Sequence, residues 1–215
     1  EMQGSLVGSE MCIRDRRDVP RGIVHRHFYR SATFGRQRRL FVYTPPGFET
    51  MEALPTVYLR HGAEHREDSW LVGGRADVIF DNLFAEGRVR PAVLVMTNGY
   101  VGEQLGGQLD RHRNGPDAMR LLARDLIEDV IPFVESAYRV VEEPRARTIA
   151  GLSMGAGQAF LIGLRHLGVF GTVAEFSSGV LSAESFDFAE ALPEVARDPE
   201  PVSYTHLRAH ETPLH

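Results

Sequence analysis

The residues best suited to chemistry lie in one short stretch, 148–155, which reads TIAGLSMG. An apolar strand pattern runs into Gly-x-Ser-x-Gly there, and a helical pattern follows from Gly157. A serine in a strand-to-helix turn takes a strained backbone conformation, and glycines such as Gly151 and Gly155 let the helix and the neighbouring strands approach closely. The pattern predicts a nucleophile elbow with Ser153 as the nucleophile.

Ser153 has a simpler alternative role as the N-cap of the following helix. Gly-x-Ser-x-Gly is a common pentapeptide, so the bare match favours that alternative. The strand before Ser153 and the helix after it favour the nucleophile instead. The first amides of that helix would then face a negatively charged oxygen on the substrate.

A serine nucleophile needs a base, and in strand–serine–helix hydrolases the acid and the histidine follow the serine along the chain. Between Ser153 and residue 200 the only histidine is His166, thirteen residues on, near the far end of the expected helix. It is too distant to act on Ser153. We therefore expect the acid and the base to lie on strands beyond this sequence, and the chain alone to be inactive.

The histidines before the elbow have structural and functional interpretations. His61 and His65 flank a glycine turn after an expected strand and could orient a substrate, although the structural interpretation is favoured for His61. His25 and His27 share one strand face and could bind a metal, but with no third ligand at a workable spacing an exposed face is favoured. His112, between two arginines, is expected in a solvated loop.

Trp70, the only tryptophan, ends the polar loop that follows the same glycine turn. Its ring could stack on a sugar or on a phenolic acyl group. It could equally be a partly buried anchor for the loop.

The elements that must position these residues alternate between strand and helix, which predicts an α/β sheet. The expected strands are 23–29, 39–43, 54–60, 91–97 and 169–176; the first alternates, and 91–97 is a continuous apolar run. The first two should form an antiparallel hairpin. Helical periodicity marks 76–85 and 118–138, with a kink at Pro132. The glycine-rich stretch 98–116 is expected to be a long loop over one edge of the sheet.

The two ends of the chain are related through the genetic code. Residues 5–15, SLVGSEMCIRD, can be encoded by a DNA sequence whose reverse complement encodes residues 202–212, VSYTHLRAHET. That DNA resembles a transposon-end adaptor used in sequencing libraries. We expect 1–16 and 201–215 to be translated adaptor, and 17–200 to be an incomplete, C-terminally truncated domain.

Composition and charge restrict which kinds of cross-link and binding partner are expected. The only cysteine, Cys12, lies in the predicted adaptor, so no disulfide is expected. The formal net charge is −5, no basic stripe is present, and no run approaches the ~20 apolar residues of a membrane-spanning helix. Nucleic acid and membrane are therefore not expected partners. No cofactor or metal is expected, and the oligomeric state is left open. We also leave the location open, with a secreted or periplasmic one as the hypothesis, because a native N-terminus should precede Arg17.

Several segments in order resemble the esterase family of α/β-hydrolases. The matching segments are RRLFVYTPPGFE at 38–49, LPTVYLRHGAEHREDSW at 54–70, GGRADVIFDNLFAEGRVRPAVLVMTNGY at 73–100, DLIEDVIPFVESAYRV at 125–140, RTIAGLSMGAGQAFLIGL at 147–164 and FSSG at 176–179. Within that family the chain is most similar to the feruloyl and acetyl xylan esterases of carbohydrate esterase family 1, with enterochelin-type esterases as neighbours.

The resemblance implies an α/β-hydrolase fold, a mostly parallel sheet with helices on both faces. It implies that Ser153 attacks an ester of an acylated carbohydrate, small or polymeric, and forms an acyl-enzyme. The N–H of Met154 would supply half of the oxyanion hole, and the amide of Ala63 the other half. The alternative is a catalytically silent member of the fold that binds carbohydrate or protein through the same cleft.

Overall fold

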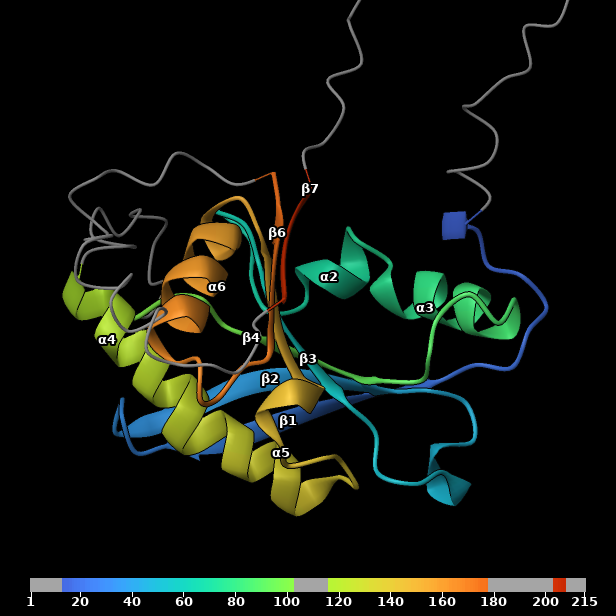
Figure 1. Cartoon of the computed structure of the whole chain (residues 1–215), viewed down its shortest axis with the longest axis horizontal. Helices are drawn as coiled ribbons and strands as arrows, with labels where there is room; N and C mark the ends of the chain where they lie inside the picture. Colours follow the sequence, from blue (N-terminus) through green and yellow to red (C-terminus); the bar gives the residue numbers. More distant parts are fainter. Residues whose placement is uncertain (1–12, 103–115, 178–202, 208–215) are drawn as a thin grey trace, which may run out of the picture.

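The computed structural model describes residues 13–102, 116–177 and 203–207, and within them seven strands form one sheet (Figure 1). The strand order is β1-β2-β4-β3-β5-β6-β7, with β1 and β2 antiparallel and β3 to β7 parallel. The strands are β1 Ile23–Ser31, β2 Arg36–Thr44, β3 Thr56–Arg60, β4 Val93–Thr97, β5 Arg147–Leu152, β6 Thr172–Phe176 and β7 Ser203–Leu207. The mostly parallel sheet and the N-terminal hairpin are confirmed.

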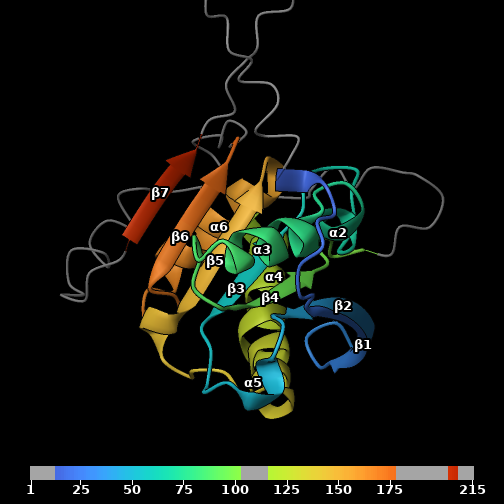
Figure 2. The same cartoon turned by 90° about the vertical axis from the view of Figure 1, so that its right-hand side faces the viewer.

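Helices cover both faces of the sheet, as expected. The helices are α2 Ser69–Val72, α3 Ala76–Ala85, α4 Pro116–Arg124, α5 Ile131–Ala137 and α6 Met154–Arg165, with short 3-10 turns η1 Phe48–Thr50 and η3 Pro144–Ala146. In Figure 1, α4, α5 and α6 lie on one side of the parallel strands, and α2 and α3 lie on the other. Figure 2 shows how far the sheet twists between β1 and β7.

Each face of the sheet has its own apolar cluster. The α4–α6 side includes Leu40, Val42, Tyr58, Val95 and Ile149 from the strands. The α2–α3 side includes Tyr43, Leu59, Leu94, Met96 and Ala150. All five residues of β4 are buried, which explains why that strand is a continuous apolar run. The two clusters hold the strand ends, and therefore the loops that follow them, in fixed positions.

The long helical segment is more irregular than the expected kinked helix. It consists of α4, a π-helix η2 at Asp125–Val130, and α5. Pro132, in the first turn of α5, has no N–H to donate to the preceding turn, so the backbone before it takes wider π geometry instead of a simple kink. The helical periodicity expected of this segment is confirmed, because the apolar side chains along one side of it are buried: Leu122, Leu126, Val130, Ile131 and Val134.

The expectation that His25 and His27 lie on an exposed face is wrong. Both are half-buried, because this face of β1 packs against Phe133 and Tyr138 at the end of α5. Nε2 of His27 lies 2.5 Å from the hydroxyl of Tyr138. Burial, and then the neighbouring His25, lower the pKa of His27.

Strand β7 lies inside the segment predicted to be translated adaptor. Its backbone pairs in parallel with β6 over five residues. An edge strand offers unpaired N–H and C=O groups to any extended segment, native or not. The adaptor prediction for 1–16 and 201–215 stays a prediction. Residues 178–200, His112 and most of the long loop fall outside the described residues.

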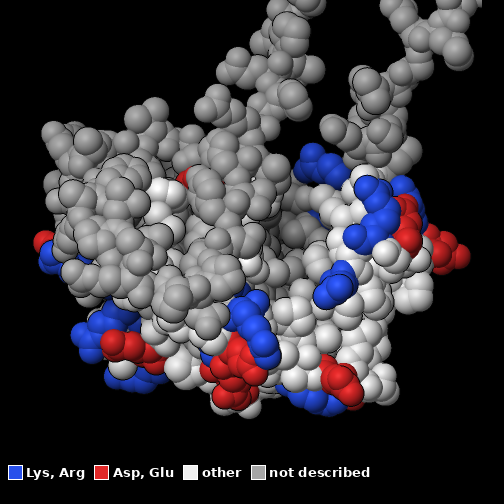
Figure 3. Space-filling view, viewed as in Figure 1, with Lys and Arg blue, Asp and Glu red and all other residues white. Residues whose placement is uncertain are grey.

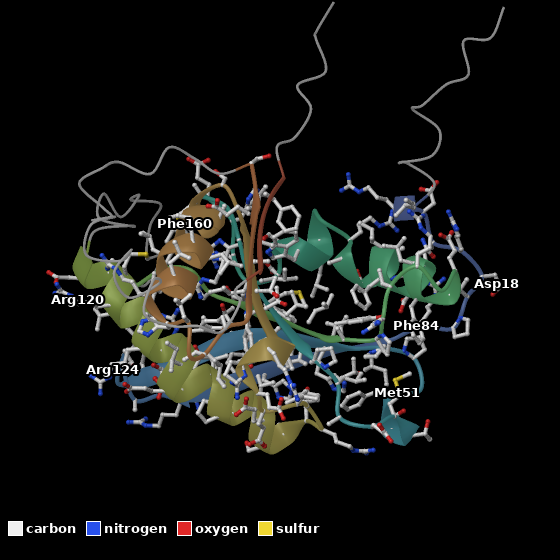
Figure 4. The ribbon with its side chains drawn as sticks, in the orientation of Figure 1. Asp18, Met51, Phe84, Arg120, Arg124 and Phe160 are labelled. Carbon is white, nitrogen blue, oxygen red and sulfur yellow. The ribbon has the colours of Figure 1, made fainter. Side chains whose placement is uncertain are left out.

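Charged side chains of both signs lie side by side on the face seen in Figure 3. Arg120 and Arg124 point away from the sheet on the outer side of α4 (Figure 4). Each of them pairs with an acid on its own helical segment, Asp117 and Glu128 respectively. Among the described residues, no helix combines the length and the apolar character needed to cross a membrane.

Candidate active site

Ser153 stands at the junction of β5 and α6, with its backbone at φ 53° and ψ −113°. A non-glycine residue rarely takes a positive φ, so this conformation is strained. Its N–H donates to the carbonyl of Phe176 at 3.0 Å, and its carbonyl accepts from Ala156 in the first turn of α6. The strained residue is thus fixed from both sides, while its side chain is exposed to solvent.

The glycines on either side of Ser153 are required by close backbone packing. A Cβ on Gly151 would lie 2.0 Å from the carbonyl oxygen of Gly155, and one on Gly155 would lie 2.3 Å from that of Arg60. Both distances are far below contact distance. Only glycine lets α6 begin this close to the ends of β5 and β3.

The turn after β3 packs directly on the elbow. A Cβ built on Gly62 would lie 3.5 Å from the carbonyl oxygen of Leu152 and 3.8 Å from Cβ of Ser153. Ala63, the next residue, is half-buried. Met154 is buried at the first position of α6, where backbone N–H groups have no partner within the helix. The structure therefore brings Ser153, Met154 and the Ala63 turn together.

His61 fixes this turn and is not free to act as a base. Its Nε2 accepts a hydrogen bond from the N–H of Gly99 at 2.9 Å, so the ring proton is on Nδ1, which donates to the carbonyl of Gly62 at 2.8 Å. Burial lowers the pKa of His61 to about 4. Both ring nitrogens are occupied in a neutral imidazole, which supports the structural interpretation of this histidine.

Two further side chains anchor the segment between β3 and α2. Glu67 is buried, and its carboxylate accepts from Nε of Arg39 at 2.5 Å and from the amide of Asn98 at 3.0 Å. The hydroxyl of Tyr100 accepts from the N–H of Glu64 at 2.7 Å. The turn that carries Ala63 is thereby attached to β2 and to the segment that follows β4.

A buried group of hydrogen-bonded side chains connects α6 to the ends of β3 and β4. Nε and Nη2 of Arg60 donate to Oε1 of Gln158 at 3.1 and 2.9 Å, and Nη1 donates to Oγ1 of Thr97 at 2.7 Å. Nε2 of Gln158 donates to the carbonyl of Gly99 at 2.9 Å. Burial, and then the nearby Arg38, lower the pKa of Arg60 to about 10. Gly99 is therefore held by His61 on one side and by Gln158 on the other.

A cavity of about 680 Å³ opens beside the elbow. Its lining extends from the turn after β3 through α2 and includes Leu152, next to the nucleophile. Trp70 lines it and also stacks edge to face on Phe176, at a centroid distance of 6.0 Å. Trp70 is half-buried in the α2–α3 cluster, so the loop-anchor interpretation is supported, although its ring also borders the cavity.

Of the two other histidines considered for catalysis, His65 lies close to Ser153 and His166 lies far from it. His65 is exposed, and a Cβ on Gly62 would lie 3.5 Å from its Nδ1, so His65 and Ser153 flank the same point. His166 caps the far end of α6, about 18 Å along a twelve-residue helix. In the parts of the chain that the structure describes, no group of three or more His, Cys, Asp or Glu side chains could hold a metal ion.

Sequence reasoning identified the elbow and the glycine turn but missed Arg60, Gln158, Gly99 and Tyr100. The one available signal was Arg60, a charged residue at the end of a strand whose other residues are uncharged. Such a residue is rarely buried without partners.

A strained serine between a parallel strand and a helix, beside a glycine turn at the carboxyl edge of the sheet, defines the α/β-hydrolase class of esterases. The "Putative esterase" family matches residues 31–202, and the chain belongs to that family.

Three relatives illustrate the similarity. The endo-1,4-beta-xylanase/feruloyl esterase of Xylanibacter ruminicola is 30% identical over 194 residues, covering 88% of this chain and 25% of that protein. A CE1 ferulic acid esterase from Anaeromyces mucronatus, solved in complex with ferulic acid, has a TM-score of 0.71 at 18% identity, covering 97% of this chain and 90% of that one. The enterobactin esterase of Shigella flexneri has a TM-score of 0.64 at 18% identity, covering 82% and 41%. The chain spans 25% of the length of the Xylanibacter ruminicola protein and 32% of a Corynebacterium glutamicum protein that is 27% identical to the chain over 142 residues.

Proposed function

We propose that the protein to which this chain belongs is a serine esterase that hydrolyses feruloyl or acetyl esters of carbohydrate through an acyl-enzyme on Ser153. The observation that carries the proposal is the backbone of Ser153, which is strained, fixed at both ends and presented to solvent beside the N-terminus of α6. Strain that the surrounding structure maintains is typical of functional positions.

The two halves of the reaction use the same groups. Oγ of Ser153 attacks the ester carbonyl and loses its proton to a base, and the carbonyl oxygen becomes negatively charged. The N–H groups of Met154 and Ala63 stabilise that oxygen. The tetrahedral species then expels the alcohol, which takes up the proton, and leaves an acyl group on Ser153. Water attacks this ester in the same way and releases the acid and free Ser153.

The scheme takes its base from a segment that follows β6 in the full-length protein, because in strand–serine–helix hydrolases the acid and the histidine follow the serine along the chain. His61 has both nitrogens occupied, and His166 is at the far end of α6. We therefore propose that the chain alone hydrolyses esters at most ~10³-fold faster than the uncatalysed reaction in water. This is the residual rate enhancement that substrate binding and an oxyanion hole give without a triad.

Two considerations support this choice of acyl group. The cavity beside Leu152 is large enough for an aromatic acid and is bordered by Trp70. The relatives named above include an esterase bound to ferulic acid and an esterase of enterobactin. The Xylanibacter ruminicola xylanase/feruloyl esterase, at 30% identity, is more similar in sequence to this chain than the enterobactin esterase, at 18%. We therefore propose a feruloylated or acetylated sugar as the substrate in preference to a siderophore.

The test is hydrolysis of a feruloylated sugar ester by the full-length protein encoded at the source locus. Ser153→Ala should lower the rate by ~10⁴-fold or more. Ser136→Ala is the matched control, because Ser136 is exposed on α5 and its hydroxyl donates only to the carbonyl of Phe133. Equal, negligible rates for wild type and Ser153→Ala on feruloyl, acetyl and siderophore esters would favour the catalytically silent binding protein.

A further inference from the structure

The outer face of β1 carries an exposed aromatic ring between two arginines. Phe28 is 59% exposed, and Arg26 and Arg30 are exposed on the same face of the strand. Alternate residues of a strand lie about 7 Å apart on one face, so Arg26 and Arg30 are the neighbours of Phe28 on either side along β1. Arg26 stacks over Phe28 at 5.9 Å, and neither arginine has an acidic partner among the described residues.

The paired strand continues this surface. Phe28 lies opposite Arg39 and Arg26 lies opposite Phe41, and directly paired residues share one face of the sheet. The guanidinium of Arg39 lies 5.5 Å from the ring centroid of Phe41. We name this surface the β1 strip, consisting of Arg26, Phe28, Arg30, Arg39 and Phe41. On the same face of β2, Tyr43 is covered by Phe80 of α3, and the strip lies beyond that contact.

The strip lies on the same face and at the same edge of the sheet as the active site. Leu40 of β2 is in register with Thr97 of β4, Thr97 with Arg60, and Arg60 with Gly151. The next row towards the carboxyl edge of the sheet has Phe28 of β1 and Arg39 of β2 at one end and Leu152 of β5 at the other. The two ends are separated by four strand spacings, about 19 Å.

Arg39 connects the strip to the cavity beside Ser153. It pairs with Glu67 at 2.5 Å and lies 4.0 Å from the carboxylate of Asp68. Asp68 lines the cavity. A ligand held by its ester at Ser153 therefore needs only to be elongated to reach Phe28.

We propose that the β1 strip binds an acidic saccharide, a glycan chain carrying uronic-acid carboxylates, whose ester is presented to Ser153. The C–H face of a sugar ring packs on an exposed aromatic face, and a guanidinium pairs with a carboxylate through two parallel hydrogen bonds. Arg26 and Arg30, which have no acidic partner among the described residues, match such a ligand, and two arginines are too few for the phosphate contacts on which nucleic-acid binding depends. The inference rests on the proposed function for the position of the ester, but the binding it predicts needs no catalysis.

The experiment is a titration of the chain with an oligogalacturonate and, separately, with a neutral xylo-oligosaccharide of matched length. We expect the acidic oligosaccharide to bind and its affinity to fall with added salt. Phe28→Ala should weaken binding about three- to tenfold, and the pair Arg26→Gln and Arg30→Gln by tenfold or more.

Matched controls should leave binding unchanged. Ile23→Ala removes a side chain of similar exposure, 51%, from the same strand. Arg120→Gln removes an exposed arginine from α4 (Figure 4). Equal affinity for the neutral oligosaccharide would overturn the proposal, and so would an unchanged affinity of Phe28→Ala, which would indicate binding by charge alone. The titrated sugars contain no ester, so their binding does not depend on catalysis. If the full-length protein hydrolyses the feruloylated ester but the chain does not bind the oligogalacturonate, the proposal for the β1 strip is overturned. If the chain binds the oligogalacturonate but the full-length protein hydrolyses no ester, only the proposed function is overturned.

Discussion

Arg60 at the end of β3 donates two hydrogen bonds to one amide oxygen, Oε1 of Gln158 in α6, ninety-eight residues along the chain. Both side chains are fully buried. A buried guanidinium that loses its acceptor pays the full cost of desolvation, so the two residues depend on each other. The contact holds the elbow helix against the strand that leads into the Ala63 turn.

This dependence predicts strong energetic coupling. Gln158→Leu should lower the free energy of unfolding by about 3 kcal/mol, because it strands the charge of Arg60. Combining it with Arg60→Met should cost about 1–3 kcal/mol less than the sum of the single changes. Urea denaturation of the four proteins measures the difference. The same cycle on the exposed pair Arg124 and Glu128 should give no more than about 0.5 kcal/mol, and equal coupling in both cycles would contradict the prediction.

The elbow glycine predicts a steric effect. Gly155→Ala should destabilise the protein by at least about 2 kcal/mol, because the new Cβ would lie 2.3 Å from the backbone carbonyl oxygen of Arg60. Gly168→Ala is the control, since no heavy atom lies within 4 Å of a Cβ at that position. Its effect should stay within about 0.5 kcal/mol. Chemical denaturation compares the two, and a tolerated Gly155→Ala would show that the elbow relaxes more readily than its packing indicates.

His61 predicts a dependence of stability on pH. Burial holds its pKa near 4 in the folded protein, whereas an unfolded histidine takes up its proton near pH 6.5. Between those values the unfolded state binds more protons, so the contribution of His61 is fully present above about pH 6.5 and is lost as the pH falls towards about 4. From about pH 7 to about pH 5 the wild type should lose about 2 kcal/mol more than His61→Gln.

Urea unfolding at the two pH values measures this difference. The other histidines are the same in both proteins, so the comparison isolates His61. Parallel losses in wild type and variant would mean that the buried imidazole is not held neutral.

The hydrogen bond of Tyr100 to the Ala63 turn predicts that removing it lowers kcat, whereas removing a comparable hydrogen bond elsewhere lowers only stability. Tyr100→Phe and Tyr138→Phe each remove one hydroxyl from a partly buried hydrogen bond, and each should cost about 1 kcal/mol. Only the hydroxyl of Tyr100 accepts from the turn that carries Ala63. In the full-length enzyme Tyr100→Phe should therefore lower kcat about tenfold with little change in KM, less than the ~10²-fold lost when an oxyanion donor is removed. Steady-state kinetics on a feruloylated ester distinguish the two variants, and equal kcat values would remove Tyr100 from the positioning of the turn.

The sequence by itself determined the features that depend on residues close together in the chain. The alternation of strand and helix patterns predicted an α/β sheet, and the helix at 76–85 was predicted with its observed ends. Gly151, Ser153 and Gly155 predicted the elbow because a strained turn between strand and helix restricts the residue types at fixed spacing. Local steric and hydrophobic constraints of this kind repeat with a short period and are readable without a structure.

Only the tertiary structure decided which distant residues complete the site. Arg60 meets Gln158, and His61 meets Gly99, because strand order and register bring the ends of β3, β4 and β5 to one edge. The same register decided which face of β1 packs on α5 and which presents Phe28 to solvent, so the prediction for His25 and His27 failed. These contacts join segments far apart in the chain, and no local pattern records them, because each depends on how the whole sheet assembles.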